Sequence, residues 1–434
     1  MRKWQVLVLL GLLQAFSFLL PYSKSQSFIG VNYGELADNL PPPSSSVTLL
    51  GSTTISKVRL YGTNAAIISA FAGTSISLLV GVSNGDIPSL AASSSAAAAW
   101  VAANILPYVP ATTISAISVG NEVLNSADAS LPSQLLPAMQ NLLSALSANY
   151  PSIKISTVHT MAVMSQSDPP SAGAFHPDLA PNLDPILTFL QQTGSPFMIN
   201  PYPWFAYNSD PRPETLAFCL FQSNPGRVDS GSGLTYMNMF DAQLDAIRAA
   251  LDAKGFNNID IVIAETGWPY KGDATEVGAT VENAQAYVGN LVTHLNSMAG
   301  TPRVPGKSVD TYLFALYDED LKSGPTSERS FGLYKTDLTQ NYDAGLSKGA
   351  STPTSLTPTP DQTQGNESSS QPNKGEAPTG WCVTAASSPG SGYVQPTSQC
   401  YTPNAVPSKQ PRAHSSVIQF ASTIFYIALL WLGR

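Results

Sequence analysis

Eight short apolar runs recur between residues 28 and 317 of this chain, and segments with helical spacing separate them. Most of the runs are apolar throughout and rich in β-branched residues, which is typical of parallel strands covered on both faces. The runs span residues 28–33, 57–61, 77–82, 114–119, 154–159, 197–202, 260–264 and 310–317. Strands that alternate with helices in this way predict an α/β fold, a closed (β/α)8 TIM barrel.

The clearest helical segment has its apolar side chains on one face at the 3.6-residue period. They are Ala284, Tyr287, Val288, Leu291, Val292 and Leu295. A second helical segment ends at Lys254 and Gly255, a cation in the last turn followed by a C-terminal glycine. An open doubly wound sheet is the alternative fold, but no glycine-rich phosphate loop follows the first run. We therefore assign residues 26–346 to the barrel.

The segments on either side of the barrel have compositions of their own. Residues 1–25 contain a basic start, an apolar run and small residues at the end, which predicts a secretory signal peptide. Residues 347–380 are rich in Ser, Thr and Pro and predict a linker without a core. Residues 405–434 end in an apolar stretch with a single terminal arginine. This favours a GPI-anchor signal, removed on maturation, over a retained transmembrane span.

These end segments also contain candidate modification sites. Asn366 lies in the only Asn-x-Ser/Thr sequence of the chain and is a candidate for glycosylation. Asn404 is the candidate attachment residue for the lipid anchor. Cys382 and Cys400 lie in one segment and can form a disulfide in an oxidising compartment, which leaves Cys219 as a buried thiol. We expect a protein at the extracellular face of the plasma membrane and in the cell wall.

The charge and the residue content narrow the class of partner. The formal charge is −8, and no dense cluster of Lys and Arg occurs, which argues against a nucleic-acid partner. The four histidines are scattered, and no cysteine has a nearby histidine at metal-ligand spacing. We expect a monomer that binds a neutral or polar ligand and needs no metal or cofactor.

Two glutamates follow apolar runs directly. Glu122 comes after the fourth run, in Val-Gly-Asn-Glu, and Glu265 comes after the seventh, in Glu-Thr-Gly-Trp-Pro. Active-site residues of a closed barrel lie at the C-terminal ends of its strands, so both carboxyl groups are expected in one cleft. Cleavage of a glycosidic bond requires one protonated and one ionised carboxyl group. The pair therefore predicts a glycosidase.

Other strand ends carry polar and aromatic side chains. They include Asn32, Tyr33, Arg59, Tyr61, Asn200 and Tyr202, and weaker candidates are Thr63, Asn64, His159 and Thr160. Glu319 and Lys322 follow the eighth run; they either support the catalytic carboxylates or form a simple helical ion pair. Trp268 either stacks on a sugar ring or belongs to the core.

Seven motifs in order resemble the plant β-1,3-glucanases of glycoside hydrolase family seventeen. Besides the two glutamate motifs they are Ile-Gly-Val-Asn-Tyr-Gly (29–34), Val-Arg-Leu-Tyr (58–61), Asn-Pro-Tyr-Pro-Trp-Phe-Ala-Tyr (200–207), Tyr-Asp-Glu-Asp-Leu-Lys (317–322) and Ser-Glu-Arg-Ser-Phe-Gly-Leu-Tyr (327–334). The resemblance covers residues 28–340. Residues 381–404 look like the start of a callose-binding module, but they are too short and too poor in cysteine to be an intact one.

The resemblance implies a (β/α)8 barrel and retaining endo-hydrolysis of β-1,3-glucans such as callose and laminarin. It implies Glu122 as the proton donor and acid/base, Glu265 as the nucleophile, and Glu319 and Lys322 as supporting residues. It also implies a groove lined by Tyr33, Asn121, Tyr202 and Phe205.

Three other functions remain open at this point. The barrel could cut mixed-linkage 1,3/1,4-β-glucan, or it could transfer the glucan to another sugar. A glucan-binding wall protein without activity is the non-enzymatic alternative, although both carboxyl groups are present.

Overall fold

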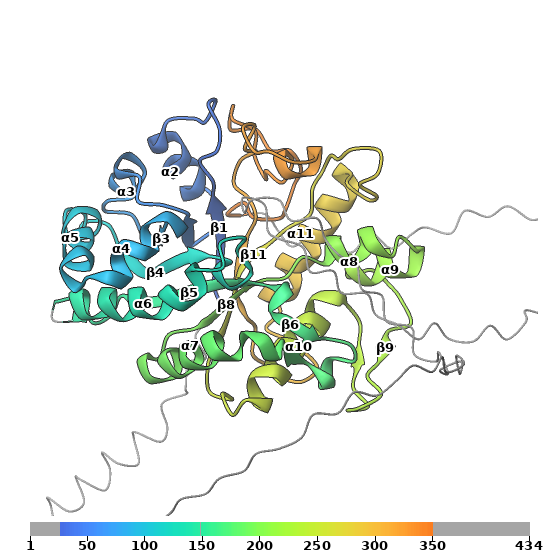
Figure 1. Cartoon of the computed structure of the whole chain (residues 1–434). Coiled ribbons are helices and arrows are strands. Elements are labelled where there is room, and N and C mark those ends of the chain that lie inside the picture. Colours follow the sequence, from blue (N-terminus) through green and yellow to red (C-terminus); the bar gives the residue numbers. More distant parts are fainter. Residues whose placement is uncertain (1–26, 148, 350–434) are drawn as a thin grey trace, which may run out of the picture. The chain divides into compact units, whose positions relative to one another are not determined.

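The computed structural model describes residues 27–147 and 149–349, and these residues contain eight parallel strands closed into a barrel. The order around the barrel is β1-β12-β11-β8-β5-β4-β3-β2, and the strands follow the ring in chain order (Figure 1). They are β1 (Ile29–Tyr33), β2 (Lys57–Leu60), β3 (Ser77–Val82), β4 (Ile114–Asn121), β5 (Lys154–Thr160), β8 (Phe197–Asn200), β11 (Ile261–Thr266) and β12 (Asp310–Leu313). The predicted TIM barrel is confirmed, and the open-sheet alternative is wrong.

Helices surround the barrel as an outer layer (Figure 1). They are α2 (Pro43–Gly51), α3 (Ala65–Ala70), α4 (Ile87–Ala92), α5 (Ser94–Asn104), α6 (Leu131–Ser147), α7 (Ala180–Thr193), α8 (Pro203–Ser209), α9 (Pro213–Cys219), α10 (Met239–Ala253) and α11 (Val281–Asn296). Two small antiparallel sheets, β6 (Met164–Gln166) with β7 (Ala174–Phe175) and β9 (Arg227–Val228) with β10 (Thr235–Tyr236), lie in the connections.

The structure confirms the predicted buried face of α11 and the predicted end of α10. The six apolar residues predicted on one face of α11 are its buried residues, and the side chain of Thr280 caps its first turn. Asn238 caps α10 in the same way, by accepting from the N–H of Asp241. Gly255, which follows α10 directly after Lys254, has a φ of 84°, the left-handed conformation that glycine adopts at little cost.

Alternation along the strands divides the core into two parts. Side chains from alternate positions of six strands form a separate cluster inside the barrel. They are Leu79, Ala116, Val158, Met198, Val262, Ala264 and Tyr312. The intervening positions, such as Ile29, Val31 and Ile263, belong to the larger cluster between strands and helices. Each strand therefore has an interior face and a helix-facing side, and this division decides which polar residues reach the site.

Two strands carry one extra residue near their C-terminal ends. Between Ser118 and Asn121, β4 advances three residues while β5 advances two. Likewise β11 advances three residues between Ile263 and Thr266 while β12 advances two. These are β-bulges, which bend a strand and redirect the side chains that follow.

The bulge of β11 brings Glu265 inside the barrel. Ala264 belongs to the interior cluster, whereas Thr266 faces outward, because its hydroxyl lies 2.6 Å from that of Tyr287 on α11. Strict alternation after Ala264 would place Glu265 on the helix-facing side. The extra residue lets Ala264 and Glu265 share the interior face.

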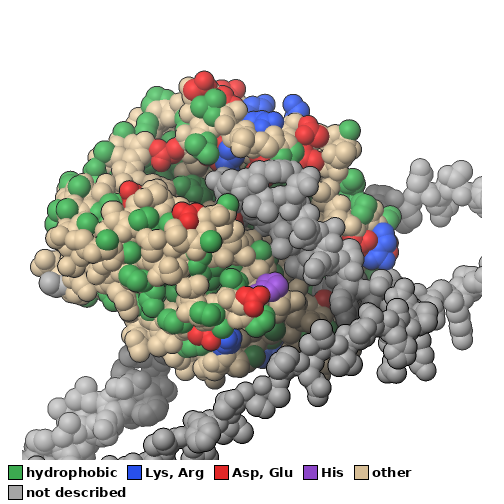
Figure 2. Space-filling view, in the orientation of Figure 1, with side chains coloured by type: hydrophobic (Ala, Val, Ile, Leu, Met, Phe, Trp, Pro, Cys, Tyr) green, Lys and Arg blue, Asp and Glu red, His purple; other side chains and the backbone are tan. Residues whose placement is uncertain are grey.

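Several predictions fall outside the described residues. They concern the signal peptide, the linker beyond residue 349, Asn366, Cys382, Cys400, Asn404 and the anchor signal. Within residues 27–147 and 149–349, no helix is long and apolar enough to cross a membrane. On the face in Figure 2, Lys and Arg side chains are few and lie near Asp and Glu.

Candidate active site

Glu265 lies at the end of β11 with no exposed surface, and three side chains donate hydrogen bonds to its carboxylate. Arg59 Nη1 and Tyr61 Oη donate to Oε1 at 2.6 and 2.7 Å. Tyr202 Oη donates to Oε2 at 2.9 Å. Both oxygens thus accept hydrogen bonds, which fixes the orientation of the carboxylate.

The two tyrosines keep their protons in this arrangement. Burial, followed by the charge of Glu265, raises the pKa of Tyr61 and of Tyr202 well above the usual value of 10.0. Burial alone would lower the pKa of Arg59, but Tyr61 and Glu265 raise it overall, so the guanidinium stays charged. The site therefore holds one fixed cation against Glu265, together with two neutral hydroxyl donors.

Arg59 also links Glu265 to the neighbouring strands. Its Nη1 donates to Asn32 Oδ1 at 3.3 Å and to the carbonyl of Ala264 at 3.1 Å. Its Nη2 donates to Asn121 Oδ1 at 2.8 Å. One buried guanidinium thus connects β1, β2, β4 and β11 at the edge where both glutamates lie.

Glu122 follows β4 and is also buried, with 3% of its surface exposed. Asn200 Nδ2, at the end of β8, donates to its Oε1 at 2.9 Å. Its own backbone is left-handed, with φ 57° and ψ 32°, and its N–H donates to the carbonyl of Val158 on β5. A left-handed glutamate is uncommon, and such conformations concentrate at functional sites. The structure brings Glu122 and Glu265 to the same end of the barrel, as predicted.

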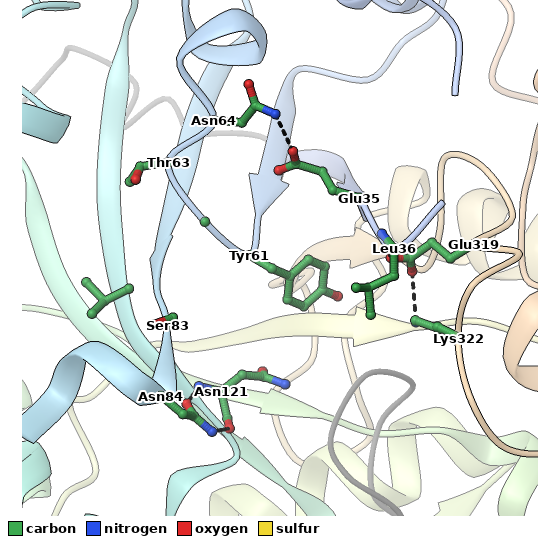
Figure 3. A pocket seen from close by; sticks show the side chains of 12 residues that line it. Glu35, Leu36, Tyr61, Thr63, Asn64, Ser83, Asn84, Asn121, Glu319 and Lys322 are labelled. Atoms are coloured by element: carbon green, nitrogen blue, oxygen red, sulfur yellow. Dashed lines mark hydrogen bonds and ion pairs between the residues drawn. The ribbon is translucent and has the colours of Figure 1, made fainter. Parts of the chain in front are cut away.

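A cavity of about 550 Å³ opens beside this network (Figure 3). Most of its lining residues are polar, and they include Glu35, Tyr61, Thr63, Asn64, Ser83, Asn84, Asn121, Glu319 and Lys322. Thr63 and Asn64, the weaker sequence candidates, are therefore lining residues. Hydroxyl, amide and carboxylate groups around one cavity suit a ligand with many hydroxyl groups.

Glu319 and Lys322 form a buried ion pair in this cavity, with Nζ 2.8 Å from Oε2. The segment is not helical, so the reading as a simple helical ion pair is wrong. Leu36 N donates to Glu319 Oε1 at 3.0 Å, and a side chain on Gly34 would collide with the Glu319 carboxylate. The segments that follow β1 and β12 therefore pack against each other at the site.

Two further carboxyl groups near the site have raised pKa values. Burial raises the pKa of Glu328 to about 7; Lys322 opposes the shift, while Glu276, Glu265 and Glu122 add to it. Burial also raises the pKa of Glu35, which accepts a hydrogen bond from Asn64 Nδ2 at 2.6 Å. Neither residue was predicted from the sequence.

Two predicted sugar-binding residues are placed elsewhere. Trp268 has no exposed surface; it packs on Tyr207 and Tyr287, and its Nε1 donates to Gly278 O at 2.8 Å. Tyr33 is 1% exposed, and its hydroxyl lies 3.1 Å from Ser46 Oγ on α2. Tyr33 shares the helix-facing side of β1 with Val31, and Trp268 packs against α11, so neither ring faces the cavity.

The remaining aromatic candidates lie next to Glu265. Tyr202 donates a hydrogen bond to it directly, and Phe205 packs edge-to-face on Tyr202 with ring centroids 5.5 Å apart.

His159 is buried and stacked on Phe197, and burial lowers its pKa to about 3, so it is a neutral core residue. Cys219 is a free, fully buried thiol, as predicted.

Comparison with known proteins decides the family. The sequence model of the family described as glycosyl hydrolases family 17 matches residues 29–345, a range that contains all eight strands of the barrel. The chain belongs to glycosyl hydrolase family 17.

Several named proteins resemble this chain over most of its length. Glucan endo-1,3-beta-glucosidase 7 of Arabidopsis thaliana is 52% identical over 417 residues, covering 92% of this chain and 80% of the relative. Glucan endo-1,3-beta-D-glucosidase of Olea europaea is 51% identical over 402 residues, covering 91% and 86%. Among solved structures, CJP38, a beta-1,3-glucanase and allergen of Cryptomeria japonica pollen, superposes with a TM-score of 0.70 at 44% identity, covering 74% of this chain and all of that one.

Proposed function

We propose that this chain hydrolyses internal 1,3-β-glucosidic linkages of β-1,3-glucans with retention of configuration. The observation that carries the proposal is the pair of buried strand-end glutamates in different environments. Glu265 receives three hydrogen bonds, one of them from a guanidinium, whereas Glu122 receives an amide donor from Asn200. The names of the relatives above support the 1,3-β linkage.

In the proposed first step, Glu265 attacks the anomeric carbon and Glu122 gives its proton to the departing glycosidic oxygen. The result is a covalent glycosyl intermediate and an ionised Glu122. In the second step Glu122 takes a proton from water, whose oxygen displaces Glu265, and the site returns to its initial state. Tyr61, Tyr202 and Arg59 hold Glu265 throughout, and the reaction requires no cofactor.

The polar cavity supplies the binding surface for the glucan. Asn121 lies beside Glu122 and lines the cavity, so it is suited to a hydroxyl group of the sugar at the cleavage point. Glu319 and Lys322 line the same cavity and place an ion pair there (Figure 3). An open cavity with polar walls accommodates a chain and is consistent with cleavage at internal bonds.

The test is laminarin hydrolysis by the full-length chain and by Glu265→Ala and Glu122→Ala. The parent is expected to release short oligosaccharides. NMR is expected to show that their new reducing ends initially have the β configuration. Both variants are expected to lose activity by at least about 100-fold. A parent that cuts only mixed-linkage glucan, that lengthens its substrate, or that yields α ends would contradict the proposal.

We also propose that the protein is secreted and held at the outer face of the plasma membrane by a GPI anchor. The composition of residues 1–25 and 405–434 supports this location. Treatment of membranes with a phosphatidylinositol-specific phospholipase is expected to release the protein. Retention in the membrane, with no lipid detected on the C-terminal peptide, would instead indicate a transmembrane span.

A further inference from the structure

The side chain of Asn84 binds the backbone of the residue before Glu122. Asn84 starts the 3₁₀ turn η1 (Asn84–Asp86), directly after β3. Its Oδ1 accepts from the N–H of Asn121 at 2.8 Å, and its Nδ2 donates to the carbonyl of Asn121 at 3.0 Å (Figure 3). Both polar atoms of one amide are therefore used on one residue of β4.

This contact continues the sheet beyond the point where the strands stop pairing. The pairing of β3 with β4 ends at Val82 and Val119. Without another partner, the N–H and carbonyl of Asn121 would have no neighbour on that side, and such groups require one when buried. Asn84 supplies both a donor and an acceptor there, as a further strand residue would.

The backbone that Asn84 holds is irregular. Gly120 has a φ of 68° and Glu122 a φ of 57°, so Asn121 lies between two left-handed residues. A side chain on Gly120 would place its Cβ 2.8 Å from Asn84 Oδ1, which shows how closely the amide approaches the bulge. A left-handed glutamate persists only where its surroundings fix the backbone.

We propose that Asn84 is a positioning residue for Glu122 and acts by pinning the β4 bulge from the turn that follows β3. This inference rests on the proposed function, in which Glu122 is the acid/base. Glu265 is held by Arg59, Tyr61 and Tyr202, and Arg59 contacts the side chain of Asn121 and not the backbone that Asn84 binds. Loss of the Asn84 contacts therefore impairs proton transfer more than nucleophilic attack.

The experiment compares two substrates that differ in their need for a proton. A laminari-oligosaccharide has a sugar leaving group that must be protonated. A 2,4-dinitrophenyl β-laminaribioside releases 2,4-dinitrophenolate, which leaves without protonation. For Asn84→Ala, kcat/KM on the oligosaccharide is expected to fall about 100-fold, the scale of a misplaced catalytic group. On the dinitrophenyl substrate, kcat/KM is expected to fall by a much smaller factor, because it reports the formation of the glycosyl intermediate without protonation of the leaving group. Asn84→Asp keeps an acceptor for the N–H of Asn121 and is expected to lose less.

A matched control separates positioning from general stability. Asn141 on α6 also uses its amide on backbone, donating to the carbonyls of Leu90 and Ala91 at 2.8 and 3.2 Å, away from the cavity. Asn141→Ala is expected to lower thermal stability without changing the ratio of the two kcat/KM values. Equal losses of Asn84→Ala on both substrates, or no loss on either, would overturn the inference. A parent inactive on both substrates would instead overturn the proposed function.

Discussion

The guanidinium of Arg59 lies 2.6 Å from Oε1 of Glu265, and the two side chains expose 1% and 0% of their surfaces. Each charge is therefore compensated mainly by the other, together with the amide and hydroxyl groups around them. Removal of one partner from such a pair leaves an uncompensated charge in the interior, which is far more costly than the loss of an exposed ion pair.

Arg59→Met is accordingly expected to lower the free energy of unfolding by about 3 to 5 kcal/mol and to abolish hydrolysis. Denaturant unfolding and laminarin assays measure the two effects. Arg303→Met is the matched control, since its pair with Asp252 is partly exposed, at 34% and 27%. It is expected to cost at most about 1 kcal/mol and to retain activity. Equal stability of the two variants would show that the buried pair is not critical to the fold.

Tyr202→Phe removes one hydrogen bond to Glu265 Oε2 and leaves the ring in place. A hydrogen bond to a charged group contributes about 1.5 to 3 kcal/mol, so a loss of about 10- to 100-fold in kcat/KM on laminarin is expected. Tyr33→Phe is the control, because the hydroxyl of Tyr33 contacts Ser46 behind the strand. If Tyr33→Phe reduces activity as much as Tyr202→Phe does, the placement of Tyr33 away from the substrate is wrong.

Trp268→Phe tests whether the indole belongs to the core or to the groove. The substitution leaves a cavity between Tyr207 and Tyr287 and removes the donor to the carbonyl of Gly278. We expect a lower melting temperature with an unchanged KM for laminarin. A raised KM at unchanged melting temperature would instead place the ring against the sugar.

Asp245 gives the protein a pH-dependent stability away from the catalytic end. Burial raises its pKa to about 6, against hydrogen bonds from Thr301 Oγ1, Arg303 N and Tyr236 Oη. Between about pH 4 and 6 the folded state therefore holds a proton that the unfolded chain has lost. The stability from this group is present below pH 4 and falls as the pH rises to 6.

Asp245→Asn cannot ionise and is expected to lack this loss. Urea unfolding of both proteins between pH 4 and 6 measures the difference in their free energies of unfolding. That difference is expected to change by about 3 kcal/mol, with the parent losing stability relative to the variant as the pH rises. Parallel curves would show that Asp245 does not titrate in this range.

The barrel and the positions of the two strand-end glutamates could be predicted because both follow from patterns along the chain. Strand-length apolar runs mark the eight strands, and a glutamate after such a run lies at the C-terminal edge. The stripe on α11 likewise matches its buried face. These features depend on spacing alone, which tertiary contacts did not alter.

The side-chain directions were harder to predict. Tyr33 shares the helix-facing side of β1 with Val31, and alternation along that strand could have excluded it from the groove. Arg59, a charged residue inside an apolar run, was a signal that an opposite charge must lie nearby. The bulges at Gly120 and Glu265 and the amide contact of Asn84 depend on neighbouring strands, which a single sequence does not specify.

The bulge in β11 has a consequence for anyone who edits this barrel. If the same residues paired with β12 without the bulge, the apolar pattern of the strand before it would be unchanged, and the chain could still close into a barrel. The carboxylate of Glu265 would then face the helix layer, and the protein would keep its fold but have no carboxylate at this position of the site. A transplant of this chemistry into another barrel must therefore carry the extra residue together with the glutamate.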